Sequence, residues 1–201
     1  MMEDDFLQRH DAKGVSLSKG IALWFTGLSG AGKSTLAHAL KGKVWRKWGS
    51  CIILDGDIMR KGINAGLGYS KEDRMENIRR IAEIASLLVD NGIICLVSTI
   101  SPYPELRENA RKIIGSEYFF EIFINASLEV CEERDVKGLY MKARQNQIGS
   151  FTGIQDEYVS PENPDLQIRT DLLSVPESVE EVMTWLDNVL TQRSVRSYVR
   201  L

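Results

Sequence analysis

One stretch near the start of the chain, Gly27 to Thr35, limits what the protein can fold into more than any other. It reads Gly-Leu-Ser-Gly-Ala-Gly-Lys-Ser-Thr, and its residues 27–34 fit the phosphate-binding loop pattern G-x-x-x-x-G-K-[ST]. The glycines let the backbone turn tightly, so that successive N–H groups face phosphate oxygens. Lys33 places a charge near the β- and γ-phosphates, and the Ser34 hydroxyl suits Mg²⁺. The stretch therefore predicts binding of a nucleoside triphosphate.

The residues on either side of this loop give it the required context. Ile21 to Thr26 is an apolar run of strand length. Leu36, Leu40, Val44 and Trp48 then recur at every fourth position, as on the apolar face of a helix. Such a helix directs its first N–H groups and the positive end of its dipole at a bound anion. Strand, loop and helix in this order make a chance glycine-rich turn the weaker interpretation.

Composition excludes several classes of protein. The chain has 201 residues, of which 43% are hydrophobic, as expected for one folded domain. A net charge of −3 gives no general attraction to nucleic acid or anionic lipid. No apolar run approaches the ~20 residues that cross a bilayer. Cys51, Cys95 and Cys131 lie far apart, which favours buried thiols over disulfides or metal ligands. With an acidic start that is unlike a secretion signal, these features predict a cytoplasmic protein.

Strand and helix patterns alternate along the rest of the chain. Further strand-like runs are Cys51–Asp55, Ile93–Thr99, Phe119–Ile124 and Leu166–Thr170. Alternation of this kind predicts an α/β three-layer sandwich with a mostly parallel five-stranded sheet, as in P-loop nucleoside triphosphate hydrolases. Ligands of such sheets bind beyond the carboxyl ends of the strands. We expect one domain at residues 21–192, an N-terminal arm at 1–20 and a tail at 193–201.

Local signals mark helix ends and loops. Ser70 with Asp73, and Ser174 with Glu177, are typical of helix N-termini. Three glycines between residues 61 and 69 predict a loop around a short helix. Prolines and glycines predict another loop at residues 149–165, and residues 134–144 are locally basic.

A phosphate loop alone does not separate a kinase from an ATPase or a switch GTPase. The chain lacks the guanine-reading string N-K-x-D, and it is short, with no added module. Cationic side chains away from the loop could hold a second anion, since Arg forks suit phosphate and sulfate. They are Arg60, Arg74, Arg79, Arg80, Lys137, Lys142 and Arg144. Any one of them is also compatible with a solvated surface charge. Together they favour a small-molecule kinase with an anionic acceptor.

Several strings outside the phosphate loop recur in one known family. They are Leu54–Asp57 with Arg60, Tyr69–Arg80, Ile100–Tyr103 with Arg107–Arg111, Leu128–Tyr140, and Phe151–Ile154. In these strings and their order, from about Gly20 to Glu181, the chain resembles the adenylyl-sulfate kinases. The resemblance implies transfer of the ATP γ-phosphoryl to the 3′-hydroxyl of adenosine 5′-phosphosulfate (adenylyl sulfate), giving 3′-phosphoadenylyl sulfate and ADP in sulfate assimilation. It also implies Mg²⁺, a lid at about residues 134–150, and a homodimer.

The resemblance assigns the ATP side of the site residue by residue. The ATP-binding residues would be Gly27, Ser29, Gly30, Ala31, Gly32, Lys33, Ser34 and Thr35, with Arg134 and Leu173 bordering the adenine. Ser34 would also hold the metal, and Lys33 would act in catalysis.

The resemblance assigns the acceptor side from later strings. Asp57 would orient or deprotonate the acceptor hydroxyl, or hold the metal through water; the alternative is a cap at a strand end. Ser101, paired with Ile100, would contact the acceptor and is the remaining catalytic candidate; the alternative is an N-cap before Pro102. The other acceptor-binding residues would be Arg60, Arg74 and Asn77 on the phosphosulfate and sugar, Tyr69 and Phe151 on the adenine, and Lys137 in the lid with Lys142 and Arg144. The two aromatic residues are also compatible with a place in the core.

The chain departs from the family pattern in places. Ile58 stands where asparagine is usual, Tyr69 replaces phenylalanine, and Gln145-Asn146-Gln147 replaces a more usual Ala-Gly-Glu. The last replacement leaves undecided whether the lid hinges at these residues. Two other functions therefore remain as alternatives: a non-catalytic nucleotide-binding module that regulates an ATP sulfurylase, and a kinase with another small acceptor. Association of the kinase itself with a sulfurylase is also left open.

Overall fold

The computed structural model describes residues 19–198 and, within the last helix, side chains as far as residue 192. The expected arm at residues 1–20 therefore lies almost wholly outside the described residues. The strands are β1 (Ala22–Thr26), β2 (Cys51–Asp55), β3 (Ile94–Ser98), β4 (Phe119–Asn125) and β5 (Leu166–Arg169). The helices are α1 (Lys33–Trp48), α2 (Gly56–Lys61), α3 (Lys71–Asp90), α4 (Pro104–Ile114), α5 (Leu128–Arg134), α6 (Leu139–Arg144) and α7 (Val175–Tyr198).

The five strands form one sheet in the order β2-β3-β1-β4-β5, and every neighbouring pair is parallel. β1 lies in the middle, where Ala22 stands opposite Cys95 of β3 and Phe119 of β4. Along the chain, β2 and β3 are added on one side of β1, and β4 and β5 are then added on the other side. This reversal opens a crevice at the carboxyl ends of the strands, where α/β sheets bind ligands.

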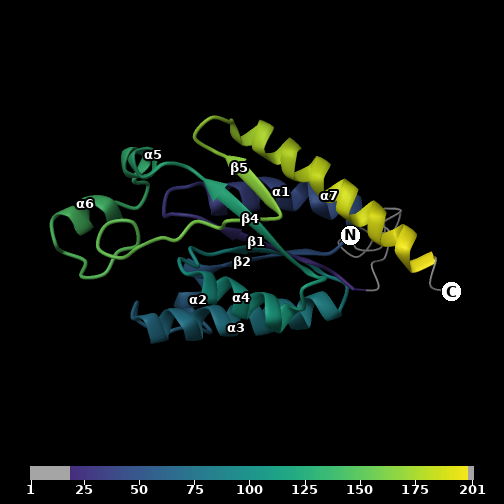
Figure 1. Cartoon of the computed structure of the whole chain (residues 1–201), viewed down its shortest axis with the longest axis horizontal. Helices are drawn as coiled ribbons and strands as arrows, with labels where there is room; N and C mark the ends of the chain where they lie inside the picture. The colour runs from purple at the N-terminus through teal and green to yellow at the C-terminus, as the bar shows by residue number, and fades with distance from the viewer. Residues whose placement is uncertain (1–18, 199–201) are drawn as a thin grey trace, which may run out of the picture.

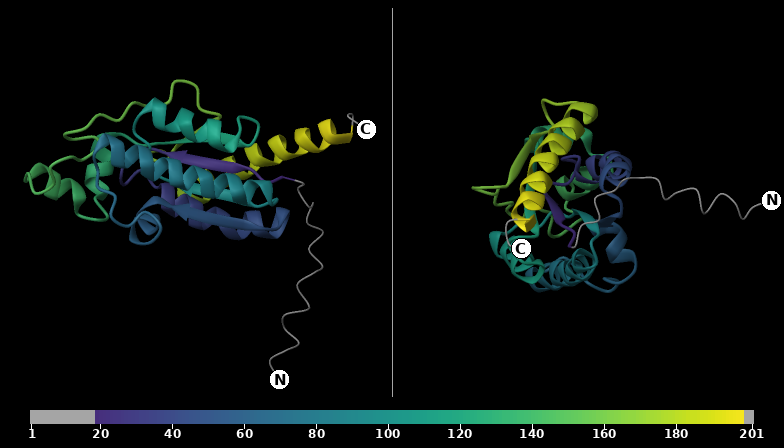
Figure 2. Two further views of the ribbon diagram at one scale, coloured as in Figure 1. Left: turned by 90° about the horizontal axis from the view of Figure 1, so that it is seen from below. Right: turned by 90° about the vertical axis from the view of Figure 1, so that its right-hand side faces the viewer.

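Helices cover both faces of the sheet, as predicted (Figure 1). Side chains of β1 alternate between the faces: Leu23 and Phe25 join the core under α1 and α7, while Ala22 and Trp24 join the core over α3 and α4. All four are fully buried, and burying a side chain such as Leu or Phe stabilises the fold by about 1.5–3 kcal/mol. Figure 2 shows the two helical layers from other directions.

Helix ends agree with the sequence in two cases. Ser70 accepts a hydrogen bond from the Asp73 N–H at 3.1 Å, and Ser174 and Glu177 cap each other reciprocally before α7. α7 runs to Tyr198, into the stretch expected to be a tail. Within residues 19–198, no helix combines the length and apolar character needed to cross a membrane.

Two short helices differ from the expectation. The short helix predicted between residues 61 and 69 lies earlier, as α2, because the Asp55 side chain caps it directly at the end of β2. α6 lies inside the basic stretch, where no helix was predicted. α5 and α6 extend beyond the carboxyl edge of the sheet (Figure 1). They stand beside the crevice that the sheet order creates.

Candidate active site

The phosphate loop joins β1 to α1 through positions that only glycine fills easily. A Cβ on Gly27 would lie 2.4 Å from the Ile124 carbonyl oxygen. Gly32 caps α1 with φ near +101°, a left-handed conformation that other residues rarely adopt. The loop therefore leads directly into the N-terminus of a helix, where backbone N–H groups and the helix dipole favour an anion.

The Lys33 ammonium lies inside the loop. Its Nζ donates hydrogen bonds to the carbonyl oxygens of Gly27 at 2.9 Å and Leu28 at 2.6 Å. Burial, together with the nearby Lys137, lowers the pKa of Lys33 to about 8. Both causes act against the charged form of the side chain. A phosphate at this position would favour the charged form again.

Oxygen ligands gather beside the first turn of α1. The Ser34 hydroxyl donates to Asp55 Oδ2 at 2.5 Å and lies 3.1 Å from the Ser98 hydroxyl. Asp55 also accepts from the backbone N–H groups of Asp57 and Ile58, so the strand-end cap considered for Asp57 is Asp55 instead. Hydroxyl and carboxylate oxygens are the ligands that Mg²⁺ prefers, and the donor set fits that ion.

Asp57 stands in the first turn of α2 with an exposed carboxylate. That carboxylate pairs with Lys137 Nζ, from the turn between α5 and α6. The pair thus joins a residue predicted to meet the acceptor hydroxyl to one predicted to lie in the lid. Because both side chains reach solvent, neither is committed to the core.

Two arginines form the wall that was predicted to hold the acceptor. Arg60 donates to the carbonyl oxygens of Leu67 and Gly68, and its guanidinium lies 4.6 Å from the centre of the Tyr69 ring. Arg74 is buried and donates to the Tyr69 carbonyl. It reaches across to the loop after α6, where it bonds Thr152 Oγ1 at 2.9 Å and Asp156 Oδ2 at 3.0 Å. Arg74 therefore ties α3 to the segment that carries Phe151.

Two further side chains complete this wall. The buried Asn64 donates from Nδ2 to Asn77 Oδ1 at 2.9 Å, which leaves the Asn77 NH₂ group as the free donor. Phe151 packs edge-on against Tyr140 with ring centres 4.9 Å apart. The Tyr140 hydroxyl in turn donates to the Ser29 carbonyl, so it connects the acceptor wall to the phosphate loop.

Most predicted site residues line a single cavity of about 500 Å³. These are Ser29, Gly30, Gly32, Lys33, Ser34, Thr35, Asp57, Arg60, Tyr69, Arg74, Asn77, Ile100, Ser101, Lys137 and Phe151. Tyr69 is 58% exposed, so it does not belong to the core, whereas Phe151 both lines the cavity and packs in the core. Residues that line the cavity and had been assigned no role in the site include Asp55, Ser98, Tyr140 and Thr152.

Some predicted residues do not line this cavity. Gly27 and Ala31 support the phosphate loop from behind, where Ala31 is fully buried. Arg134 bonds the carbonyl oxygens of Gly30 and Thr170, and Leu173 packs against the core. Of the lid cations, Arg144 instead pairs with Glu132 on the surface.

Lys142 is also exposed and does not line the cavity. Of the three basic residues predicted for the lid, Lys137 is thus the one that the structure places at the site. Lys137 lies in the turn before α6, whereas Lys142 and Arg144 lie in the last turn of that helix.

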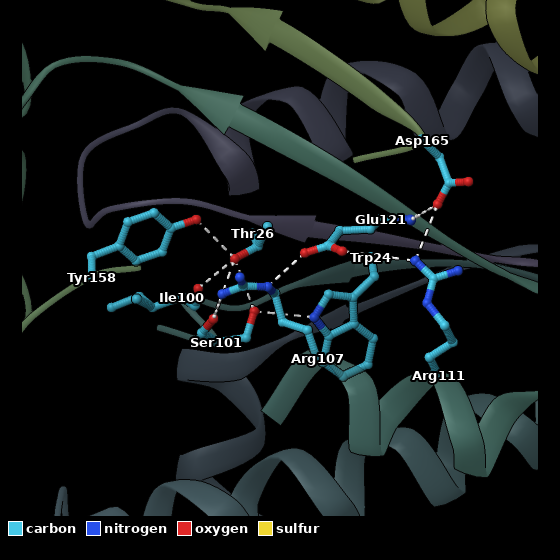
Figure 3. A network of polar contacts seen from close by, with 9 residues as sticks. All are labelled: Trp24, Thr26, Ile100, Ser101, Arg107, Arg111, Glu121, Tyr158 and Asp165. Carbon is cyan, nitrogen blue, oxygen red and sulfur yellow. Dashed lines mark hydrogen bonds and ion pairs between the residues drawn. The ribbon is translucent and has the colours of Figure 1, made fainter. Parts of the chain in front are cut away.

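Ser101 is not the N-cap of α4. Tyr103 holds that position, with Pro104 in the first turn, and no side chain caps the helix. The Ser101 hydroxyl accepts a hydrogen bond from Trp24 Nε1 at 3.1 Å and donates to Thr26 Oγ1 at 3.0 Å (Figure 3). Ser101 is 1% exposed, so its side chain is fixed by the core beneath the cavity.

The sequence profile of the family described as Adenylylsulphate kinase matches residues 19–169. This match spans the phosphate loop and every wall of the cavity. The chain belongs to the adenylyl-sulfate kinase family. It is an ATP-dependent kinase, and the reaction of this family is phosphoryl transfer to adenylyl sulfate.

Relatives within the family cover most of the chain. The adenylyl-sulfate kinase of Picosynechococcus sp. is 55% identical over 165 residues, which are 82% of this chain and 92% of the relative. The solved structure of the Mycobacterium tuberculosis APS kinase CysC in complex with AMPPNP and APS shares 46% identity, with a TM-score of 0.80. It covers 84% of this chain and 98% of its own. A hexameric APS kinase from Thiobacillus denitrificans shares 32% identity with a TM-score of 0.64, over 85% of this chain and 29% of its own.

Proposed function

We propose that the single cavity binds ATP and adenylyl sulfate together and passes the γ-phosphoryl of ATP to the 3′-hydroxyl of adenylyl sulfate. The products are ADP and 3′-phosphoadenylyl sulfate. The observation that carries the proposal is that the phosphate loop and the acceptor arginines line one continuous space. Phosphoryl transfer depends mainly on positioning and charge neutralisation, and this cavity offers groups for both.

On the ATP side, the backbone of residues 27–35 holds the phosphates, and Lys33 neutralises charge on the transferring group. Ser34 and Asp55, with Asp57 close by, hold Mg²⁺, which supplies charge neutralisation when bound. Arg134 and Leu173 border the adenine. The bonds from Arg134 to Gly30 and Thr170 support this placement, because they hold its guanidinium across the outer side of the loop.

On the acceptor side, Arg60, Arg74 and Asn77 bind the phosphosulfate and the sugar. Asn77 donates from its NH₂ group, whose direction is fixed by Asn64. Tyr69 and Phe151 stack on the acceptor adenine, a contact commonly contributing ~1–3 kcal/mol per base in single-strand binding. Ile100 and Ser101 form the adjoining wall.

Asp57 orients the attacking hydroxyl and receives its proton. Its exposed carboxylate, which pairs with Lys137, supports this role, because a fully buried carboxylate could not meet an incoming substrate. Lys137 and residues around it close over the phosphates as a lid at about residues 134–150. Closure excludes water and directs transfer to the acceptor.

We further propose that the protein works as a cytoplasmic homodimer. All three cysteines are free and buried, as expected for a reducing compartment. The hexameric relative supports self-association of this fold. We also propose a sulfurylase as a partner, because its product, adenylyl sulfate, is the acceptor used here.

The deciding experiment mixes purified protein with Mg·ATP and adenylyl sulfate and follows release of ADP and formation of 3′-phosphoadenylyl sulfate. We expect both products in equal amounts. A Lys33→Ala variant gives the background, and product at that background level contradicts the proposal. Binding of adenylyl sulfate without turnover would instead favour a non-catalytic module. A panel of other nucleotides and sugars tests the acceptor.

A further inference from the structure

A strained turn forms one wall of the cavity. Ile100, Ser101 and Pro102 follow β3 and all line the cavity; we call them the acceptor turn. Ser101 has φ near +40°, in the left-handed region that a residue with a side chain seldom enters. Residues in that region persist where their surroundings hold them there, and they gather at functional sites.

Hydrogen bonds from several elements hold the acceptor turn from beneath (Figure 3). Thr26 Oγ1 donates to the Ile100 carbonyl at 2.7 Å, and the Tyr158 hydroxyl lies 3.0 Å from the same Thr26 oxygen. The Val159 N–H donates to the Pro102 carbonyl at 2.9 Å. The turn is therefore fixed by β1 on one side and by the loop before β5 on the other.

The strongest of these contacts comes from a buried cation. Arg107, on α4, donates from Nη1 to the Ser101 carbonyl at 2.9 Å, and only 4% of the residue is exposed. A hydrogen bond from a charged donor is stronger than a neutral one, and it acts here on the residue with the strained backbone. Neither Ile100 nor Ser101 can change its backbone conformation without losing this bond or the one from Thr26.

A carboxylate on β4 fixes the direction of Arg107. Glu121 Oε1 lies 2.6 Å from Arg107 Nε, and both side chains are about nine-tenths buried or more. Arg111, one helical turn further along α4, lies 3.7 Å from Glu121 Oε2 and 3.4 Å from Asp165. Arg111 thus shares the partner of Arg107, but the structure gives it no hydrogen bond to the acceptor turn, which makes it a matched control.

We propose that Arg107, oriented by Glu121, is a positioning residue for the acceptor: it holds the Ile100–Ser101 backbone in the conformation that forms the acceptor wall. The inference rests on the proposed function, because it takes the acceptor to be adenylyl sulfate. Arg107 itself does not line the cavity, so its effect passes through the turn. The expected result is a change in the KM for the acceptor with little change in the KM for ATP.

The test compares steady-state constants of Arg107→Met and Arg111→Met with those of the wild type. Arg107→Met should raise the KM for adenylyl sulfate by about tenfold or more, as expected for loss of one charged hydrogen bond, and shift the KM for ATP by less than about twofold. Arg107→Lys keeps the charge but lacks the fork that reaches both partners, so we expect a smaller rise in the same constant. Arg111→Met should leave both KM values close to wild type.

Removing Arg107 alone leaves the buried Glu121 charge with only the longer 3.7 Å contact to Arg111, which threatens folding. The double variant Arg107→Met/Glu121→Gln avoids that charge, and its thermal unfolding is recorded beside its kinetics. It should show the same selective rise. Three outcomes would each overturn the inference. They are equal changes in both KM values, an unchanged KM for adenylyl sulfate, and an Arg111→Met variant with the same constants as Arg107→Met. Turnover of adenylyl sulfate by the wild type tests the proposed function separately: if the wild type shows none, the proposed function fails, whatever the variants do.

Discussion

The two halves of the cavity are built in different ways. The phosphate loop takes its shape from bonds within itself: Lys33 bonds carbonyl oxygens five and six residues back, and the Ala31 N–H bonds Leu28. Arg134, Tyr140 and Thr170 then bond carbonyl oxygens of the loop from outside it. The acceptor half is assembled across the chain. Arg74 bonds side chains 78 and 82 residues away, and Trp24 bonds a serine 77 residues away. The phosphate loop thus owes its shape to bonds between residues that are near in sequence, and the acceptor half owes its shape to tertiary packing.

The difference has a consequence for substitutions. Changes in the phosphate loop should remove charge from the transferring group and so lower kcat. Changes in the acceptor half should disturb a wall that only one substrate touches, and so raise the KM for that substrate. Four experiments test this division, beginning with the one that should have the largest effect.

Replacing Lys33 with methionine should lower kcat by about 10²–10³-fold, the usual result of removing a preorganised charge from the transition state. The side chain is buried, and methionine fills a similar volume, so the loop should keep its shape. ADP release in the presence of both substrates measures the effect. Lys41→Met, an exposed position on the same helix, is the control. If Lys33→Met turned over at a rate near that of the control, Lys33 and its loop would have no role in phosphoryl transfer.

Arg74→Ala should raise the KM for adenylyl sulfate far more than the KM for ATP. Loss of a hydrogen bond from a charged donor costs about 1.5–3 kcal/mol, which corresponds to roughly ten- to a hundredfold in binding. Initial rates with each substrate varied in turn give the two constants. Arg79→Ala is the matched control, since Arg79 lies on the same helix and pairs with Glu76 and Glu83 at the surface.

Arg74 also anchors the loop that carries Phe151, and a second variant separates this role. Asp156→Asn keeps Arg74 but weakens the ion pair at 3.0 Å. We expect a smaller rise in the same KM. If Arg74→Ala altered both constants equally, the two halves would not be independent and the division proposed above would fail.

The pKa of Lys33, lowered by burial to about 8, predicts proton uptake when ADP binds above that pH. At pH 9 the free side chain is mostly neutral, and phosphates restore its charge, so about one proton should be taken up per nucleotide. Affinity should accordingly fall as pH rises above 8. Calorimetry in two buffers of different ionisation enthalpy measures the uptake. Lys33→Arg stays charged throughout and should abolish it; persistent uptake in that variant would assign the proton to another group.

The same division explains what could be predicted from the sequence. The loop was recognisable because its chemistry lies in consecutive residues, and the strands because runs such as Cys51–Leu54 are apolar. Asp55 was assigned no role in the site, since its bond to Ser34 forms only after β2 is placed in the sheet. Tyr140 was missed because its partner Ser29 is 111 residues away. α6 is too short for its periodicity to show. Acceptor residues could be named only through resemblance to a family.

Ile58 offers the smallest expected effect and the finest test of where the acceptor half ends. The family usually has asparagine here, yet Ile58 is 61% exposed on α2 and does not line the cavity, although its neighbour Asp57 does. Ile58→Asn should therefore change both KM values by less than about twofold and stability by less than about 0.5 kcal/mol, as for most exposed positions. Kinetics and chemical denaturation measure the two effects. A several-fold change in the KM for adenylyl sulfate alone would contradict this expectation. It would mean that the outer side of α2 also contributes to acceptor binding, through the helix that Ile58 shares with Asp57 and Arg60.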